Sequence, residues 1–529
     1  MRRGVRPRAS GRDSVSDVPS FRSFPPDKAA IVMASDGRTV RFGELETHAN
    51  KGAHALRALG LRTGDKLAIC IANSPEFFHV VCAARRSGLT IVPISTRLTA
   101  GELGFIVGDS GARALILSPG IEASADEAAS LCGGVPILMT GAGGGPGSWE
   151  AACAAQPDTP IADEARGREM LYSSGTTGRP KGIVYEDYSD GPQGRDATSS
   201  ARRMFDRLGL DDETVYLSPA PLYHSAPFAW AIGVIEMGGT TIVMEHFDAE
   251  QALALIDAHR ITVTQWVPTH FVRMLKLPDA VRRRYDMSSL RIAIHAAAPC
   301  PVPVKQAMID WWGPILLEYF GSSEQTALTF ITSEEWLAHP GSVGRCVLGK
   351  LHICDEQRRP LPQGEVGVIY SEGGTPFSYH NDAAKTAESR SPEGWTTVGD
   401  IGRIDEEGYL YLTDRKSFMI ITGGVNVYPQ EIENRLITHP GVADVAVIGA
   451  PDDDLGEVVT AVVQPVDLAD AGPAFADELR RWMRQELSGV KVPKHILFRR
   501  DLPRLPTGKM AKHKLRDDIA ADFAAGRAP

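Results

Sequence analysis

The sequence has few cysteines, no long apolar run and no excess of positive charge. Its 7 cysteines among 529 residues are scattered, odd in number and never spaced as Cys-x-x-Cys, which favours reduced thiols in a cytoplasm over a disulfide framework or a zinc site. No uninterrupted apolar stretch approaches the roughly 18 residues that span a membrane. The formal net charge of -10 argues against a general nucleic-acid binder. We therefore predict a cytoplasmic protein with no membrane span and no nucleic-acid partner.

The length of the chain predicts more than one domain. A chain of 529 residues exceeds what one hydrophobic core usually supports, so we expect at least two domains. Strand-like segments at 66–71 and 240–244 alternate with helix-like segments at 102–107 and 252–259. This alternation is typical of the α/β class.

Residues 1–28 are predicted to be a disordered N-terminal extension. Residues 1–12 are rich in arginine, and Pro7 and Gly11 would interrupt the apolar core or amphipathic helix that a targeting peptide needs. The sequence suggests no function for this extension.

A second, smaller domain is predicted at the C-terminal end. Residues 444–448 and 458–463 read as short apolar strands, and a helix with one apolar face follows them. We expect a core-packing role for that face, which consists of Phe475, Leu479, Trp482, Met483 and Leu487. Gly489 is the expected end of this helix. The boundary predicted near 415–417 divides the chain into a large domain at 29–413, a hinge at 414–417 and a small domain at 418–529.

The most informative segment is the string Tyr-Ser-Ser-Gly-Thr-Thr-Gly-Arg-Pro-Lys-Gly at 172–182. Apolar residues precede and follow it, so it is predicted to be a loop between two strands. Its glycines let backbone N–H groups approach a ligand, its hydroxyl groups can donate hydrogen bonds, and its lysine adds a positive charge. The spacing differs from the Walker pattern. The predicted ligands of a polyphosphate are Ser173, Ser174, Gly175, Thr176, Thr177, Gly178 and Lys181.

This string resembles the phosphate-loop signature of the acyl-adenylate-forming enzymes, a superfamily that includes acyl-CoA synthetases, luciferases and peptide-synthetase adenylation domains. Further segments resemble its other signatures in the same order, at 221–225, 296–299, 318–324, 394–400, 414–416, 423–429 and 505–509. The resemblance implies an α/β fold with a large multi-layered N-terminal domain, which includes a distorted β-barrel subdomain. A small mobile α+β domain would follow, turning about a hinge at Lys416 and Ser417.

The resemblance also implies a nucleotide site. Ala297, Ala298 and Pro299 would line one side of adenine, and Phe320 would stack on it beside Gly321.

Four more residues complete the implied nucleotide site. Ser323 would contact the α-phosphate and Arg415 would reach the nucleotide. Glu324 would bind Mg²⁺, which commonly takes one carboxylate together with phosphates and waters. Asp400 would accept hydrogen bonds from both ribose hydroxyls, because a carboxylate has two acceptor oxygens.

The resemblance assigns two functions to the C-terminal part of the chain. Lys509 would be the catalytic lysine that touches the substrate carboxylate and the α-phosphate. Gly423, Gly424 and Val425 would line the pantetheine path of coenzyme A. A basic cluster within 490–514 could hold the CoA phosphates or be a solvated face, and the sequence leaves both open.

An acyl pocket is predicted near His224, which the resemblance places on the substrate side. With Lys509 and Glu324, His224 is a candidate catalytic residue. No Asp or Glu occurs from 217 to 235. That disfavours an amino-acid substrate, because its buried ammonium group would lack a partner. The candidate pocket residues are Tyr223, Phe228, Trp266, His295 and Ala296, a mostly apolar and aromatic set. They predict a hydrophobic acid.

The predicted activity is an ATP-dependent carboxylic acid–CoA ligase that uses ATP, Mg²⁺ and coenzyme A. Two alternatives remain: an enzyme specialised for thioesterification of preformed acyl-AMP, and a non-catalytic nucleotide-binding homologue. The sequence departs mildly from the superfamily pattern, with Phe320 for tyrosine, Ser323 for threonine, Gln325 for glycine and Ser417 for Asp or Lys. These departures suggest that adenylation is the weaker half-reaction. A homodimer is also left open.

Overall fold

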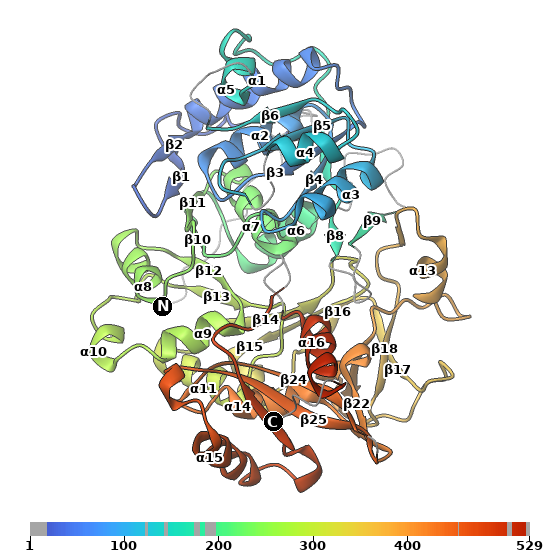
Figure 1. Cartoon of the computed structure of the whole chain (residues 1–529). Coiled ribbons are helices and arrows are strands. Elements are labelled where there is room, and N and C mark those ends of the chain that lie inside the picture. Colours follow the sequence, from blue (N-terminus) through green and yellow to red (C-terminus); the bar gives the residue numbers. More distant parts are fainter. Residues whose placement is uncertain are drawn as a thin grey trace.

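Figure 1 shows a computed structural model of the chain. It describes residues 18, 20–121, 125–141, 147–173, 180–185, 197–452, 454–504 and 510–524. The architecture is mixed α/β, with a large N-terminal domain and a smaller C-terminal domain (Figure 1). Within the described residues, no helix combines the length and apolar character needed to cross a membrane.

A nine-stranded sheet forms the centre of the large domain. Its order is β16-β15-β14-β13-β12-β10-β11-β1-β2. The parallel strands are β1 (Ala29–Met33), β10 (Val215–Ser218), β11 (Thr240–Val243), β12 (Val263–Trp266), β13 (Ile292–His295) and β14 (Leu316–Gly321). The antiparallel strands are β2 (Thr39–Arg41), β15 (Leu328–Thr332) and β16 (Arg345–Leu348). The predicted strand at 240–244 is confirmed.

Helices cover both faces of this sheet. One face packs on α6 (Ala197–Leu208) and α7 (Ser225–Glu236). The other packs on α8 (Ala249–Ala258), α9 (Pro268–Leu275) and α11 (Val302–Trp312), near α10 (Asp279–Arg282) and α12 (Ser333–Ala338). The predicted helix at 252–259 is α8, which begins where the Asp248 side chain accepts a hydrogen bond from the backbone N–H of Gln251 at 2.8 Å.

A second, parallel sheet has the order β6-β5-β3-β4-β7. Its strands are β3 (Lys66–Cys70), β4 (Thr90–Pro93), β5 (Ala114–Leu117), β6 (Ile137–Met139) and β7 (Arg168–Glu169). Its helices are α1 (Phe42–Ala58), α2 (Pro75–Arg86), α3 (Ala100–Ser110), α4 (Ala125–Leu131) and α5 (Trp149–Ala154). The predicted strand at 66–71 and helix at 102–107 are confirmed as β3 and α3.

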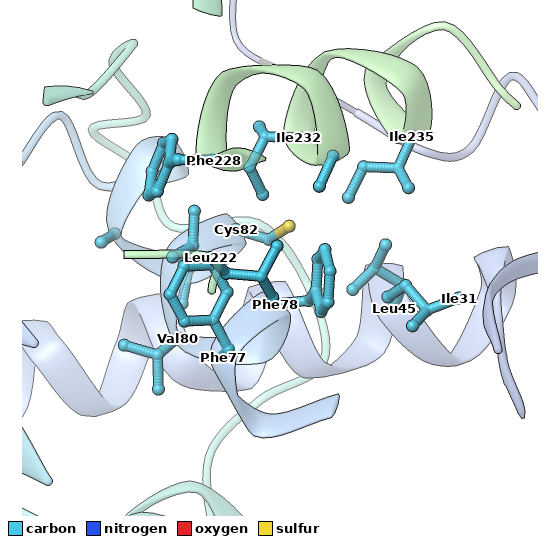
Figure 2. Packing of buried hydrophobic residues seen from close by; sticks show 14 of the residues in the cluster. Ile31, Leu45, Phe77, Phe78, Val80, Cys82, Leu222, Phe228, Ile232 and Ile235 are labelled. Carbon is cyan, nitrogen blue, oxygen red and sulfur yellow. The ribbon is translucent and has the colours of Figure 1, made fainter. Parts of the chain in front are cut away.

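The two sheets share one hydrophobic core. Figure 2 shows Phe77 and Phe78 of α2 lying beneath Phe228 and Ile232 of α7, where buried side chains from distant parts of the sequence meet. The rings of Phe77 and Phe228 meet edge to face at 5.8 Å between centroids. This packing fixes α7, and with it the segment that precedes α7, against the rest of the domain.

A third region is antiparallel. One sheet has the order β17-β18-β20-β21, with β17 (Lys350–Cys354), β18 (Gly367–Glu372), β20 (Asp400–Ile404) and β21 (Leu410–Arg415). Another has the order β19-β9-β8, with β8 (Tyr172–Ser173), β9 (Lys181–Tyr185) and β19 (Phe377–Tyr379), and α13 (Ala383–Glu388) follows it. The resemblance implied a distorted β-barrel subdomain without giving its position, and among the described residues these strands form two separate sheets.

The smaller domain is built on a five-stranded sheet. Its strands are β22 (Ile420–Thr422), β23 (Val425–Val427), β24 (Val442–Asp452), β25 (Gly456–Pro465) and β26 (His495–Phe498), and its helices are α14 (Pro429–Leu436), α15 (Pro473–Arg484) and α16 (Lys512–Ala524). Strands β24 and β25 confirm the two predicted apolar strands. The side chain of Lys276, the residue after α9, donates a hydrogen bond to the backbone oxygen of Val442, which joins this domain to the large one.

Helix α15 confirms the predicted apolar face but not its predicted end. Phe475, Leu479 and Met483 are buried in the core of the small domain. The helix ends at Arg484, and Gly489 instead begins a 3₁₀ turn at Gly489–Lys491. The prediction of a glycine stop was wrong because the chain leaves the helix through Gln485, whose backbone is right-handed and needs no glycine.

Candidate functional site

The predicted phosphate loop connects two paired strands. Strands β8 and β9 are antiparallel, with Tyr172 opposite Gly182 and Ser173 opposite Lys181. The sequence predicted a loop between two strands, and the structure adds that the two strands pair with each other. The predicted ligands at its centre lie outside the described residues: Ser174, Gly175, Thr176, Thr177 and Gly178.

Lys181, at the start of β9, lies beside Tyr379 and near Glu324. Its Nζ atom is 5.7 Å from the centroid of the Tyr379 ring. Burial lowers the pKa of Lys181, and the charge of Lys385 lowers it further. The carboxylates that act on this pKa in the opposite direction are those of Asp382, Glu388 and Glu324. The Lys181 ammonium group, beside an aromatic ring and near the Glu324 carboxylate, can bind a phosphate group of a polyphosphate.

Glu324 follows β14 and is buried at 6% exposure. Its Oε1 atom accepts a hydrogen bond from the Tyr379 hydroxyl at 3.0 Å. Burial and the negative charge of Glu324 raise the pKa of Tyr379, so the hydroxyl keeps its proton for this bond. Strand β19 pairs with β9, and this pairing places Tyr379 between Lys181 and Glu324. Three segments far apart in the sequence thus meet at one point.

The residues present fit a Mg²⁺ ion. Among the described residues, the Oε2 atom of Glu324 accepts no hydrogen bond, so this largely buried side chain has a carboxylate oxygen available for a cation. No three His, Cys, Asp or Glu side chains in the described part of the chain gather as an all-protein metal cage would require. One carboxylate next to a phosphate loop is the arrangement that Mg²⁺ commonly uses with nucleotides.

Asp400 and Phe320 line the same small cavity, together with Val398 and Thr397. Asp400 begins β20 and is 7% exposed, and its Oδ1 atom lies 2.9 Å from Nε of Arg415. The register of β20 and β21 places these two residues directly opposite each other. The predicted adenine-stacking ring and the predicted ribose carboxylate are therefore neighbours, and Gly321 follows Phe320 on β14.

The predicted adenine-lining segment leaves the sheet at the end of β13. Ala296 is buried, whereas Ala297 and Ala298 are exposed and Pro299 is half-buried. Ala297 has a left-handed backbone with φ of 75°. This conformation costs a non-glycine residue about 1–2 kcal/mol, and such strain is often found at ligand sites.

The structure separates some of the predicted acyl-pocket residues. Tyr223 and His224 stand directly before α7, with their rings 4.6 Å apart. Phe228 lies in the cluster on the α7 face of the central sheet, and Trp266 lies in the cluster on the opposite face. The structure does not bring these two side chains together, and core packing accounts for the burial of both.

His295 lies in a buried ionic cluster that the sequence did not reveal. Its Nε2 atom is 3.6 Å from Oε2 of Glu318, and the same oxygen lies 2.6 Å from Nζ of Lys305. Burial lowers the pKa of His295 well below its ordinary value, and Lys305 lowers it further, so the imidazole is neutral. Lys305 falls between the buried residues Val304 and Met308 on α11, which is the only sequence signal for its burial.

The predicted hinge connects β21 to β22. The Oδ2 atom of Asp414 accepts a hydrogen bond from the backbone N–H of Gln430 at 2.9 Å, which satisfies a donor in the first turn of α14. Lys416 and Ser417 lie in a short 3₁₀ turn, Lys416–Phe418. The segment between the two domains is therefore short and anchored on both sides.

Gly423 and Gly424 form the turn between β22 and β23. Thr422 pairs with Val425, and both glycines have positive φ, 55° and 79°. A two-residue hairpin with this geometry favours Gly-Gly. A Cβ added at Gly424 would meet nothing within 4 Å, and Val425 is 47% exposed. The space beside Gly424, in the segment predicted to line the pantetheine path, is therefore free of other protein atoms among the described residues.

Lys509 lies outside the described residues, but the ends of its segment are fixed. Arg504 and Met510 form an antiparallel bridge, and the backbone N–H of Ala511 donates to the oxygen of Pro503 at 2.9 Å. Lys512 follows, with its Nζ atom 2.7 Å from Oε1 of Glu433 on α14.

Comparisons with known proteins identify the family. The profile of the AMP-binding enzyme matches residues 20–378, and the profile of the AMP-binding enzyme C-terminal domain matches residues 431–509. The chain belongs to the AMP-binding enzyme family.

Several relatives resemble this AMP-binding enzyme over nearly their whole length. A feruloyl-CoA synthase from an Amycolatopsis species is 32% identical over 492 residues, which cover 92% of this chain and 95% of the relative. The long-chain-fatty-acid–CoA ligase FadD13 of Mycobacterium tuberculosis is 33% identical over 515 residues, with coverage of 94% and 96%. The structure of ATP-bound MatB from Rhodopseudomonas palustris is similar with a TM-score of 0.80 and 29% identity, covering 96% of this chain and all (100%) of the other.

Sequence reasoning missed two residues that contact the predicted nucleotide site of this AMP-binding enzyme, Tyr379 and Tyr185. Tyr379 contacts Glu324 across 55 residues, and Tyr185 contacts Gln325 across 140 residues. These contacts arise from the pairing of β9 with β19 and from the turn after β14. A single sequence carries no signal for such long-range partners.

Proposed function

We propose that this AMP-binding enzyme is an acid–CoA ligase. It converts a hydrophobic carboxylic acid and ATP into acyl-AMP and pyrophosphate, and then transfers the acyl group to coenzyme A with release of AMP. Two groups of residues carry this proposal: Lys181, Tyr379 and Glu324 form one, and Phe320 and Asp400, which line one cavity, form the other. The short segment from Phe320 to Glu324, at the end of β14 and just after it, joins the two groups. Such a site suits the phosphates, the base and the ribose of one nucleotide.

In the first half-reaction, a carboxylate oxygen of the acid attacks the α-phosphorus of ATP and pyrophosphate leaves. Lys181 holds the phosphates, Asp400 holds the ribose, and Phe320 stacks on adenine. Glu324 would hold Mg²⁺, and the ion would supply positive charge beside the phosphates. Lys509 stabilises the charge that develops as the two anions meet, which is an electrostatic role of the kind that dominates many enzymatic accelerations.

In the second half-reaction, the thiol of coenzyme A attacks the acyl carbonyl carbon and AMP leaves. The Gly423–Gly424 turn has no side chain and offers a path for the narrow pantetheine arm. Rotation of the small domain about 414–417 would exchange Lys509 for this turn, so that one site serves both steps. Domain motions often play such a gating role. On this proposal the domains span 29–413 and 418–529.

The proposed substrate is a hydrophobic acid, and the proposed location is the cytoplasm. Tyr223, His224 and Ala296 lie near the start of α7 and the end of β13, among apolar surroundings that suit an uncharged acyl group. Two relatives carry names of hydrophobic substrates, a feruloyl group and long-chain fatty acids. We assign Tyr223, His224 and Ala296 to the acyl side of the site.

Pyrophosphate release with a panel of acids tests this function. Aliphatic and aromatic acids are offered with ATP and Mg²⁺ in the absence of coenzyme A, and thioester is then measured after coenzyme A is added. We expect release of pyrophosphate only with a hydrophobic acid, followed by an equivalent amount of thioester. Binding of ATP with no acid-dependent turnover for any member of the panel would indicate a non-catalytic homologue instead.

A further inference from the structure

Two tyrosines from the β19-β9-β8 sheet hold the turn between β14 and β15. The hydroxyl of Tyr185, at the end of β9, donates a hydrogen bond to the backbone oxygen of Ser323. The hydroxyl of Tyr379 donates to Oε1 of Glu324 at 3.0 Å. Tyr185 lies opposite Phe377 on β19, so both tyrosines belong to one rigid pair of strands. This pair of strands begins at Lys181, next to the phosphate loop.

Gln325 completes this arrangement in a strained conformation. Its φ is 53°, in the left-handed region that residues other than glycine rarely adopt. Its Nε2 atom donates to the Tyr185 hydroxyl at 3.1 Å, its backbone N–H donates to the oxygen of Ser322 at 3.0 Å, and its backbone oxygen accepts from the N–H of Thr375 at 3.0 Å. These three contacts hold a backbone that would otherwise relax.

The hydrogen bonds form a chain in which Gln325 donates to the Tyr185 oxygen and Tyr185 donates its own proton to the oxygen of Ser323. Removal of the Tyr185 hydroxyl therefore breaks two contacts at once, and removal of the Gln325 amide breaks the first. Between these two anchored positions lies Glu324.

We propose that Tyr185 and Gln325 are positioning residues that hold the turn at 322–325, so that Ser323 and Glu324 face the phosphates and Mg²⁺ of a bound nucleotide. This inference rests on the proposed function and adds the residues that orient Ser323 and Glu324 within the site. Tyr379 takes one oxygen of Glu324, and the turn sets the direction of the other. The left-handed Gln325 is then part of the site rather than a neutral substitution.

The test compares binding of MgATP and AMP by calorimetry in Tyr185→Phe, Gln325→Ala and the double variant. Each single variant should bind MgATP about tenfold more weakly, because a hydrogen bond that positions a ligand group is lost. The Mg²⁺ concentration for half-maximal ATP binding should rise. AMP, which needs no Mg²⁺, should lose at most about threefold. The double variant should lose little more than either single one, since the residues act as a unit.

Two further variants separate positioning from general damage. Tyr370→Phe is the matched control, because Tyr370 is buried on β18 and its hydroxyl has no hydrogen-bond partner among the described residues. It should bind MgATP like wild type. Gln325→Gly relieves the left-handed strain but lacks the amide. It should melt at a higher temperature than Gln325→Ala and show the same loss of MgATP affinity.

The outcomes distinguish this inference from the proposed function. If wild-type protein binds no MgATP, the proposed function fails and the inference with it. If wild type binds MgATP and Tyr185→Phe and Gln325→Ala bind it within twofold of wild type, the inference alone is wrong. An equal loss for AMP and MgATP, or a full recovery of affinity in Gln325→Gly, would also overturn it.

Discussion

Replacement of Asp400 by alanine should weaken every ribonucleotide ligand by one common factor. Asp400 is buried, lines the cavity beside Phe320, and is the proposed acceptor for both ribose hydroxyls. Hydrogen bonds to a charged acceptor contribute about 1.5 kcal/mol each, so the two together contribute about 3 kcal/mol. That corresponds to a dissociation constant about 150-fold higher. ATP and AMP carry the same ribose and should lose equally.

The same substitution should disturb the fold very little. The Arg415 side chain that pairs with Asp400 is 39% exposed, so water can replace its lost partner. Pairs with this degree of exposure contribute less than about 1 kcal/mol to the free energy of unfolding. Glu406→Ala is the matched control, since Glu406 is an exposed acid in the turn that follows β20. It should change neither nucleotide affinity nor melting temperature.

Titration calorimetry with ATP and with 2′-deoxy-ATP provides the assay. Wild type should bind the ribonucleotide more tightly than the deoxynucleotide, and Asp400→Ala should bind both alike. Loss of ATP affinity with undiminished preference for the ribonucleotide would show that Asp400 acts on another part of the ligand. An unchanged affinity would refute the assignment.

Three further outcomes are expected. Lys509→Ala should cripple acyl-AMP formation by a hundredfold or more, on the order of 3 kcal/mol, while it spares thioester formation from supplied acyl-AMP; equal losses in both steps would contradict this role. Gly424→Leu should keep acid-dependent pyrophosphate release and lose thioester formation, whereas Gly424→Ala, which has the same backbone strain with little bulk, should keep both; normal thioester formation in the leucine variant would refute the path. His270→Gln should reduce the pH dependence of the free energy of unfolding. Burial lowers the pKa of His270 to about 3, so the stability that depends on its neutral form is fully present above about pH 6.5. That stability is lost as the pH falls toward 3, at up to about 1.4 kcal/mol per pH unit. Chemical denaturation at pH 7, 6 and 5 measures that slope, and identical slopes in wild type and variant would contradict the assignment.

Local patterns predicted the elements of this fold well. Strands β3 and β11 and helices α3 and α8 follow from short-range periodicity, because their buried faces repeat with the period of a strand or a helix. The hairpin β8–β9 around the phosphate loop follows from apolar residues on both sides of a glycine-rich segment. The end of α15 was missed because the chain leaves the helix at Gln485, with right-handed backbone angles, rather than at the expected glycine.

Long-range contacts could not be predicted from the sequence. The buried Lys305–Glu318 pair and the hydrogen bond from Tyr379 to Glu324 join residues whose neighbourhood is decided by strand order. Phe228 and Trp266 were predicted to line one pocket because both are large and aromatic. They lie on opposite faces of the central sheet, and a sequence pattern does not give the face on which each residue packs.

An oxygen-isotope experiment tests the central claim most directly. A hydrophobic acid labelled with ¹⁸O in its carboxylate is incubated with ATP, Mg²⁺ and coenzyme A, and the products are examined by mass spectrometry. If a carboxylate oxygen attacks the α-phosphorus, it stays with the nucleotide when the thiol attacks the carbonyl. The account predicts one ¹⁸O atom in each AMP formed with acyl-CoA and none in pyrophosphate. Label in inorganic phosphate with ADP as the nucleotide product, or acyl-CoA formed without label in AMP, would contradict it.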